Sequence, residues 1–322
     1  MTYRLYIPAL LLNLISLIAL AQTEEPIRLN TGSLVLDGTL TLPANATKLV
    51  PVVLLIAGSG PTDRDGNISV PAGRPNGVKA GSYRMLADSL AKLGVAVVRY
   101  DKRGVGRSVR VDMSEKNLTF ETYIQDATAW LDQLRADKRF SRFAVVGHSE
   151  GSLIGMVAAH QTKANAFVSL AGPGSDIATK LKAQLGPQLP ETARQSVFNA
   201  LDSLKAGLEV TPPTQYPVIR QMFRPSVQPY MISWMKYDPA VQLRLLTIPV
   251  LIIQGKRDIQ VMVADAELLK AARPDATMVL FDEMNHILKN APADRIENFK
   301  TYSNPTLPLT PGLATAIADF VK

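Results

Sequence analysis

The chain has 322 residues, 47% of them hydrophobic and 20% charged, with a formal net charge of +7. This composition is ordinary for a globular protein and excludes a predominantly disordered chain, and the length allows one large α/β domain or two small ones. The basic residues are scattered, and no Lys/Arg-rich run coincides with a reading motif, so the sequence indicates no nucleic-acid partner.

The first 21 residues have the three parts of a secretory signal peptide. Arg4 supplies the basic start, residues 5–20 carry no charge, and Ala19-Leu20-Ala21 provides small residues at a cleavage site. A membrane anchor is the alternative, but the apolar span is slightly short for a bilayer crossing. We therefore expect cleavage after Ala21 and a periplasmic or secreted protein without a stable membrane anchor. The chain has no cysteine, which excludes a lipid-modified cysteine, disulfides and thiol chemistry.

The next segments alternate between predicted strands and helices. Residues 33–42 (SLVLDGTLTL) predict a hairpin or paired strands near Asp37-Gly38. Residues 50–57 form the continuous apolar run of a buried parallel strand, and a polar loop rich in Gly and Pro spans 58–81. The following elements are a helix over 83–93, a strand over 95–100, an amphipathic helix with apolar positions from Tyr123 to Leu134, a strand over 143–146, a helix to about His160 and a strand over 166–171.

The alternation stops at Gly172-Pro173-Gly174 and later resumes. Residues 176–238 have a helical pattern interrupted by prolines, which predicts an insertion over one end of the sheet. After it we expect a strand over 249–254, a helix over 264–272, a strand over 277–281 and a last helix capped by Thr310, with Pro311 at its first position.

This order predicts an α/β fold with a mostly parallel central sheet, helices on both faces and right-handed crossovers. The predicted division is a signal peptide at 1–21, a first core part at 22–175, a helical lid at 176–238 and a second core part at 239–322.

Residues 147–151 (GHSEG) form a G-x-S-x-G pattern between a predicted strand and a predicted helix. This is the setting of a nucleophile elbow, in which the serine stands on a sharp turn and the glycines let neighbouring backbone pass close by. A serine hydroxyl becomes a good nucleophile only when a base takes its proton and an acid orients that base. The pattern therefore predicts Ser149 as a nucleophile that needs two partners.

The base is found by elimination among three histidines. His148 adjoins Ser149 inside the turn, so its side chain should point away from the serine. His160 lies three helical turns further, roughly 16 Å along the axis. His286, in a loop after the strand that ends at Phe281, remains as the base.

The acid should follow a strand between the serine and the histidine. Asp258 fits, because it comes shortly after the strand over 249–254, and Asp282 is the second choice. The chain order Ser149, Asp258, His286 is that of α/β-hydrolases and differs from the two familiar serine-protease orders.

An oxyanion hole needs two backbone N–H groups. One should come from Glu150, the residue after the nucleophile, and the other from the loop that begins Gly58-Ser59-Gly60-Pro61. Pro61 has no N–H, so the second donor is Ser59 or Gly60, and we favour Ser59. We expect Gly58 and Gly60 to border the bound substrate.

Five separated motifs resemble an exported bacterial esterase branch of the α/β-hydrolases, which is related to serine aminopeptidases and acylglycerol lipases. They are GSGPTDRDGN at 58–67, YDKRGVGRS at 100–108, GHSEG at 147–151, Gly255-x-x-Asp258 and MNHILK at 284–289. The resemblance covers most of the chain from about Ser33. It implies cofactor-free hydrolysis of carboxylic esters, an acyl-serine intermediate and a helical lid. Lipases commonly open the oxyanion loop with His-Gly, where this chain has Ala57-Gly58, so the identity of the first donor stays open.

Two further features concern the substrate. The carboxyl group of Glu150 lies beside the nucleophile, where it either holds a substrate amine or forms an ion pair, for instance with Arg64 or Arg103. The lid carries several aromatic and methionine side chains, which either pack on the sheet or line a pocket, and Trp234 among them is a candidate substrate contact.

These features predict a serine hydrolase that cleaves small-molecule esters of small or medium acyl groups, with no cofactor and no metal. One alternative is a serine exo-peptidase or amidase that binds a free amino end at Glu150. Another is a catalytically silent binding protein with a hydrolase fold.

Overall fold

The computed structural model describes residues 22–44, 48–69, 77–110 and 112–322. The predicted signal peptide, residues 1–21, lies outside them. Within the described ranges, no helix combines the length and the apolar character that a bilayer crossing requires.

The core of the fold is an eight-stranded sheet, in which β6, β3, β7, β8, β9 and β10 run parallel to one another and β2 is antiparallel to both β1 and β6. Its spatial order is β1 (Thr23–Asn30), β2 (Val35–Leu42), β6 (Ala96–Tyr100), β3 (Val50–Ile56), β7 (Phe140–His148), β8 (Ala166–Leu170), β9 (Val250–Gly255) and β10 (Thr277–Phe281). Two short strands, β4 (Asn67–Ile68) and β5 (Val78–Lys79), pair separately. The central strands are buried on both faces, which explains their continuous apolar runs.

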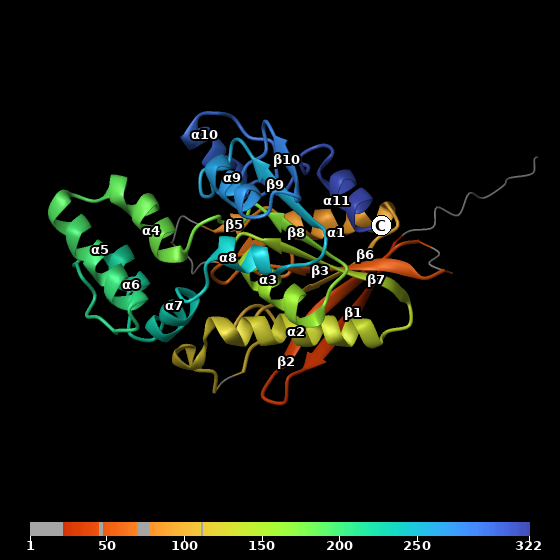
Figure 1. The fold of residues 1–322 in the computed structure, drawn as a ribbon, viewed down its shortest axis with the longest axis horizontal. Coiled ribbons are helices and arrows are strands. Elements are labelled where there is room, and N and C mark those ends of the chain that lie inside the picture. Colours follow the sequence, from red (N-terminus) through yellow and green to blue (C-terminus); the bar gives the residue numbers. More distant parts are fainter. Residues whose placement is uncertain (1–21, 45–47, 70–76, 111) are drawn as a thin grey trace, which may run out of the picture.

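Helices cover both faces of this sheet, so the predicted α/β class is confirmed (Figure 1). On one face lie α2 (Phe120–Ala136), α3 (Glu150–Thr162), α8 (Pro239–Leu245) and α9 (Val263–Ala272), and on the other α1 (Ser82–Lys92) and α11 (Leu313–Val321). The remaining helices of the core are α10 (Arg295–Lys300) and the short 3-10 turns η1 (Glu115–Asn117) and η3 (Thr301–Ser303).

The first hairpin turns earlier than its sequence predicts. Residues 31–34 connect β1 to β2, with Gly32 at a φ of 81° and the Thr31 hydroxyl donating to the Leu34 carbonyl at 2.8 Å. The predicted turn residues Asp37 and Gly38 lie inside β2 instead. Gly38 is used there for close packing, because a Cβ would stand 3.1 Å from the carbonyl oxygen of Arg99.

The last helix also differs from its prediction. It begins at Leu313 and is preceded by Gly312, whose φ of 84° ends the loop, so Thr310 and Pro311 are not part of it. Thr310 belongs to the loop before the helix, where its N–H donates to the Leu288 carbonyl at 2.9 Å.

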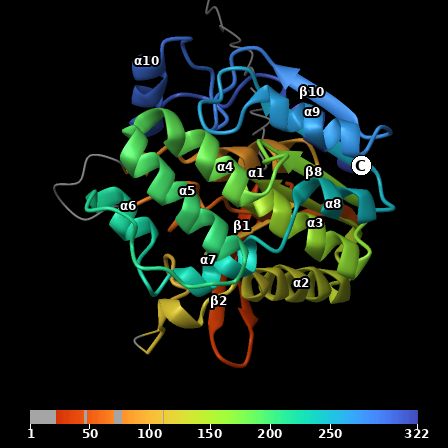
Figure 2. The same ribbon diagram turned by 60° about the vertical axis from the view of Figure 1, so that its left-hand side comes forward.

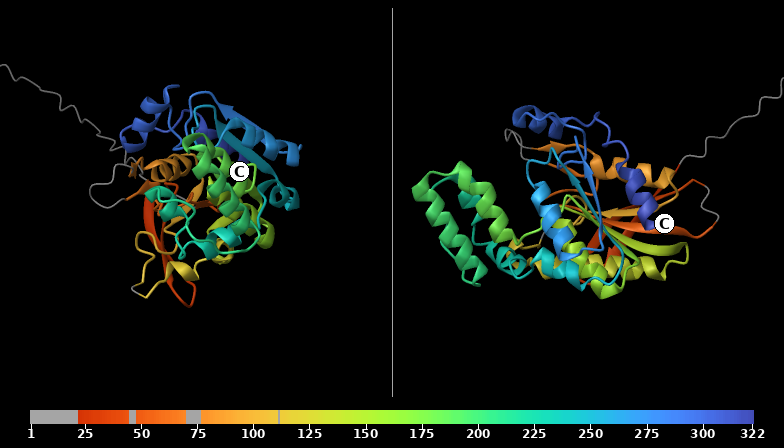
Figure 3. Two further views of the ribbon diagram at one scale, coloured as in Figure 1. Left: turned by 90° about the vertical axis from the view of Figure 1, so that its left-hand side faces the viewer. Right: turned by 45° about the horizontal axis from the view of Figure 1, so that its top comes forward.

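The predicted lid, which lies between β8 and α8, contains four described helices: α4 (Ile177–Leu185), α5 (Glu191–Lys205), α6 (Pro217–Met222) and α7 (Gln228–Trp234), with the turn η2 (Gly186–Gln188). In Figures 1 and 3, α4, α5 and α6 stand to one side of the sheet, whereas α7 lies beside α2 (Figure 2). The contact between α7 and α2 is specific: the ring of Trp234 stacks on Phe120 at 5.7 Å, and the Phe120 N–H donates to Ser233 Oγ at 2.7 Å.

The loop after β3 is tied to the sheet by Arg64. Its guanidinium bridges the carboxylates of Asp37 and Asp101, all three side chains are largely buried, and the Arg64–Asp101 distance is 2.7 Å. Asp101 also accepts the N–H groups of Arg64 and Arg107, at 2.8 and 2.9 Å. Without the guanidinium, the buried Asp101 would lose its ion-pair partner and, among the described residues, Asp37 would keep only the exposed Arg28.

We therefore expect Arg64→Met to lower the free energy of unfolding by about 3 kcal/mol, because breaking a buried ion pair strands its partners. Arg28→Met is the matched control: it also pairs with Asp37, at 3.2 Å, but its side chain is 70% exposed, so its loss should be below about 1 kcal/mol. Urea unfolding measures both, and equal losses would contradict this account.

Candidate active site

Ser149 stands on the turn between β7 and α3 in a conformation that few residues adopt, with φ at 55° and ψ at −122°. The flanking glycines make this turn possible. A Cβ on Gly147 would lie 2.2 Å from the carbonyl oxygen of Gly151, and a Cβ on Gly151 would lie 2.3 Å from that of Ile56. The serine itself is only partly buried, so its hydroxyl is presented at the carboxyl end of the sheet.

Asp258 and His286 meet at the same end of the sheet. Asp258 follows β9, and its Oδ2 lies 2.7 Å from His286 Nδ1. The other carboxylate oxygen accepts the N–H groups of Gln260 and Val261 at 2.7 and 2.9 Å. Burial alone would raise the pKa of Asp258, but His286 and these N–H groups outweigh it and lower the pKa below its usual value. An ionised Asp258 places the proton of neutral His286 on Nδ1 and leaves Nε2 to accept another.

The other candidates lie elsewhere. The side chain of Asp282 is 79% exposed and pairs with Lys256 at 2.7 Å, so it does not take the position of the acid beside His286. His160 is exposed near the end of α3.

His148 precedes Ser149 in the chain, and its side chain contacts the backbone of His286. Its Nε2 lies 2.8 Å from the carbonyl oxygen of His286, its Nδ1 lies 2.7 Å from the hydroxyl of Tyr83, and its ring centroid is 4.8 Å from that of His286. The imidazole of His148 is occupied by these two partners, which could not be foreseen from the sequence because they are 65 and 138 residues away. Ser149 makes no hydrogen bond to His286 in the described part of the chain, and such contacts commonly tighten only with bound substrate.

His148 is held neutral. Burial and the neighbouring His286 lower its pKa to about 3. A neutral ring with its proton on Nε2 donates to the His286 carbonyl and accepts from Tyr83, which satisfies both nitrogens.

The two predicted oxyanion donors are the N–H groups of Ser59 and Glu150. Neither the N–H of Ser59 nor that of Glu150 has an acceptor among the described residues. The loop before Ser59 packs directly on the turn, since a Cβ on Gly58 would lie 3.2 Å from Ser149 Cβ. Gly60, at a φ of 71°, has open space around it.

Glu150 forms an ion pair, but the arginines named from the sequence are wrong as its partners. Its buried carboxylate lies 2.9 Å from Lys102 Nζ and also accepts the hydroxyl of Tyr230 from α7. Arg64 is committed to Asp37 and Asp101, and Arg103 pairs with Asp126 at 2.6 Å. Lys102 and Tyr230 are thus neighbours of the site that the sequence did not reveal, although Lys102 lies within the YDKRGVGRS motif.

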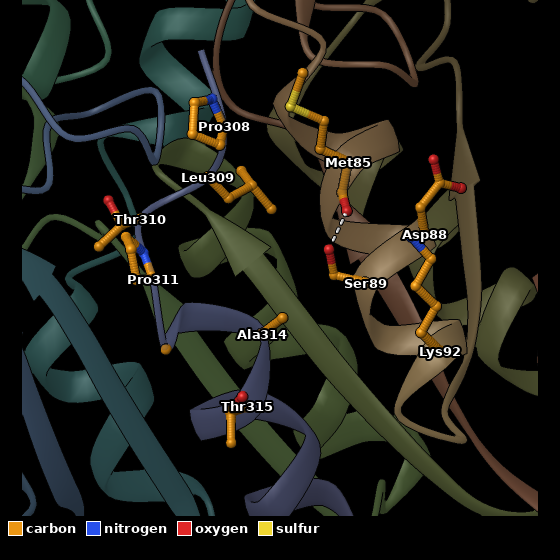
Figure 4. A pocket seen from close by; sticks show the side chains of 11 residues that line it. Met85, Asp88, Ser89, Lys92, Pro308, Leu309, Thr310, Pro311, Ala314 and Thr315 are labelled. Atoms are coloured by element: carbon orange, nitrogen blue, oxygen red, sulfur yellow. Dashed lines mark hydrogen bonds between the residues drawn. The ribbon is translucent and has the colours of Figure 1, made fainter. Parts of the chain in front are cut away.

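Trp234 is buried against Phe120, so the structure places it in the packing between lid and core, and its contact with substrate stays a prediction. A cavity of about 390 Å³ lies between α1 and residues 308–315 (Figure 4), but none of the candidate site residues lines it. Across the described ranges, no three His, Asp or Glu side chains gather as a metal site would require.

The chain is similar to a known protein family and to a known relative. A family model described as "Serine aminopeptidase, S33" matches residues 77–292. Esterase EstD from Thermotoga maritima is 30% identical over 258 residues, which are 79% of this chain and 58% of that protein. This chain therefore spans less than two thirds of the relative's length.

Solved esterase structures share the fold. Est1E from Butyrivibrio proteoclasticus, described with bound ferulic acid, superimposes with a TM-score of 0.54 at 17% identity and covers 81% of this chain and 91% of its own. The Pyrococcus furiosus esterase Pf2001 gives a TM-score of 0.53 at 18% identity, with 83% of each chain covered. At these identities the likeness concerns the fold alone.

The neutral His148 makes stability depend on pH. In the unfolded chain its pKa returns to about 6.5, so below that pH the unfolded state binds more protons, and this contribution to stability is lost as the pH falls from about 6.5 towards 3. At about 1.4 kcal/mol per pH unit, it amounts to about 2 kcal/mol by pH 5.

We expect the wild type to lose about 2 kcal/mol more than His148→Gln between pH 7.5 and pH 5, measured by urea unfolding. His160→Gln, at the exposed end of α3, should behave like the wild type. A variant at His148 that lost as much stability as the wild type would show that this ring is not held neutral.

Proposed function

The chain belongs to the serine aminopeptidase S33 family, and from this premise we propose that it hydrolyses carboxylic esters of small or medium acyl groups through an acyl-serine intermediate. The observation that carries the proposal is the 2.7 Å contact between Asp258 and His286 at the end of the sheet where the strained turn presents Ser149. The esterase relative supports ester substrates.

In the proposed reaction, His286 Nε2 takes the hydroxyl proton as Ser149 Oγ attacks the acyl carbon. The N–H groups of Ser59 and Glu150 bind the negative oxygen of the tetrahedral intermediate. His286 then returns its proton to the leaving alcohol as the ester C–O bond breaks. Water repeats the sequence on the acyl-serine and releases the acid, while Asp258 keeps the imidazole oriented and stabilises its cation.

The contacts of Glu150 favour an ester over a peptide with a free amino end. An exo-peptidase would need a carboxylate available to the substrate's ammonium group. Here both oxygens of Glu150 are already engaged, one by Lys102 and one by Tyr230. A substrate amine would have to displace a buried ion pair, which is costly.

We expect Ser149→Ala to lose about 10⁴-fold or more in kcat on p-nitrophenyl esters, because the nucleophile and its base act as a unit. The wild type should react with a fluorophosphonate probe, and this variant should not. Folded wild-type protein that fails to react would instead identify a catalytically silent binding protein.

The acyl preference is measured with esters of graded chain length, and aminoacyl amides are assayed beside them. Turnover of the amides alone would establish the alternative function, a serine exo-peptidase or amidase.

The same assay tests the acid. Asp258→Asn should lower kcat about 10⁴-fold, since the imidazole would lose its orienting carboxylate. Asp282→Asn is the matched control and should keep nearly full activity, because its exposed side chain contacts Lys256 rather than His286. The reverse result would move the acid to Asp282.

We also infer from the composition of residues 4–21 that the protein is exported to the periplasm or beyond. The mature protein should begin at Gln22, which N-terminal sequencing after expression from Met1 determines. An uncleaved N-terminus would favour the membrane-anchor alternative.

A further inference from the structure

The peptide groups around Gly58 are fixed from two sides. The Gly58 N–H donates to the hydroxyl of Tyr83 at 3.1 Å, and the Gly58 carbonyl accepts from Lys102 Nζ at 2.6 Å. Gly58 is buried, whereas Ser59 and Gly60 after it are exposed. The loop is therefore anchored immediately before the residue proposed to supply an oxyanion donor.

The anchor is a buried lysine. Lys102 is 1% exposed, and its ammonium meets the Gly58 carbonyl, the Glu150 carboxylate at 2.9 Å and the face of the Tyr123 ring at 5.0 Å. A lysine this deeply buried is expensive unless its charge is compensated, and Glu150 compensates it. Glu150 alone would compensate the charge of Lys102, so charge compensation does not explain the additional hydrogen bond to the Gly58 carbonyl.

That carbonyl controls the direction of the Ser59 N–H. The two groups belong to one planar peptide unit, and none of the peptide bonds that the structure describes is cis. In a trans unit the C=O and the N–H point in opposite directions. An ammonium that holds the Gly58 carbonyl on one side thus turns the Ser59 N–H to the other side. It also draws electron density towards the carbonyl oxygen, which makes this N–H a stronger donor.

The same ammonium reaches the second donor residue. Lys102 binds the side chain of Glu150, whose own N–H opens α3, and Tyr230 holds the remaining carboxylate oxygen. One side chain therefore connects the two residues whose N–H groups have no acceptor in the described part of the chain.

We propose that Lys102 is the positioning residue of the oxyanion hole, which sets the direction of the Ser59 N–H through the Gly58 carbonyl and its spacing from the Glu150 N–H. This role rests on the proposed ester hydrolysis. Lys102 does not touch the reacting atoms. It acts only through the peptide that does.

Lys102→Met tests the role, because it keeps the length of the side chain and removes the ammonium. We expect kcat on p-nitrophenyl butyrate to fall about 10²- to 10³-fold, the range for loss of one oxyanion donor, with KM changed less than about threefold. The inhibition constant of an aryl trifluoromethyl ketone, which forms an oxyanion when serine adds to it, should rise by the same factor. A purely structural lysine would not move these two quantities together. Unchanged kcat in Lys102→Met would overturn the proposal.

Two further variants separate this role from general damage. Arg103→Met breaks the neighbouring buried ion pair with Asp126 but leaves Gly58 and Glu150 untouched, so kcat should stay within about threefold of the wild type. The double variant Lys102→Met/Glu150→Gln removes both charges and therefore relieves the stranded carboxylate. It should recover thermal stability but not kcat, and recovery of kcat would show that Lys102 serves only as a countercharge.

If Lys102→Met does not fold, charge-balanced variants carry the test. Lys102→Gln/Glu150→Gln keeps an N–H donor for the Gly58 carbonyl, and its kcat should exceed that of Lys102→Met/Glu150→Gln at least about tenfold. Equal kcat values would overturn the proposal. Failure of the underlying ester hydrolysis would look different, because the wild type itself would then be inert to both the ester and a fluorophosphonate.

Discussion

A residue other than glycine at a φ of 55° and a ψ of −122° carries about 1–3 kcal/mol of backbone strain. Ser149 keeps this conformation because the contacts around the turn prevent its backbone from relaxing. The Ser149 N–H is held by the Leu170 carbonyl of β8 at 3.0 Å. Before and after it, Gly147 and Gly151 lie so close to neighbouring backbone that no Cβ would fit. The packing of α3 onto β3 and the emergence of Ser149 at the end of the sheet follow from this one turn, so the site and the core depend on the same contacts.

The two side chains that flank the nucleophile extend this constraint to opposite sides. His148 reaches the backbone of His286 and, through Tyr83, the Gly58 N–H. Glu150 reaches Lys102, which holds the Gly58 carbonyl. The proposed base and the proposed oxyanion loop are therefore both held in place by side chains of the GHSEG turn. This arrangement explains why a site assembled from loops far apart in the chain can be rigid before substrate arrives.

The sequence predicted most of the sheet, because central strands reveal themselves as apolar runs whatever their neighbours are. It also placed Asp258 first among the acids that follow a strand, and the contact of Asp258 with His286 agrees, although the shared edge of a parallel sheet alone does not exclude Asp282. It failed where a distant contact decided a local choice. Asp37-Gly38 has good turn chemistry, yet the register of β2 against β6 and the ion pair with Arg64 keep it in a strand. Likewise the partner of Glu150 is Lys102 rather than Arg64 or Arg103, and only the folded loop distinguishes three basic side chains from one another.

The charge states around Ser149 fit the proposed chemistry. When His286 accepts the serine proton it becomes a cation, and Asp258 lies 2.7 Å away to stabilise it. A protonated His148, with its ring 4.8 Å from that of His286, would oppose this by about 3 kcal/mol at an effective dielectric constant of about 20. Burial keeps His148 neutral and removes that penalty. On the other side, Lys102 and Glu150 form a buried ion pair, so the carboxylate beside the nucleophile adds no net negative charge against an anionic intermediate. The nucleophile is thus flanked by groups that hold geometry without competing for charge, which leaves the imidazolium and the oxyanion as the only charges that develop during the reaction.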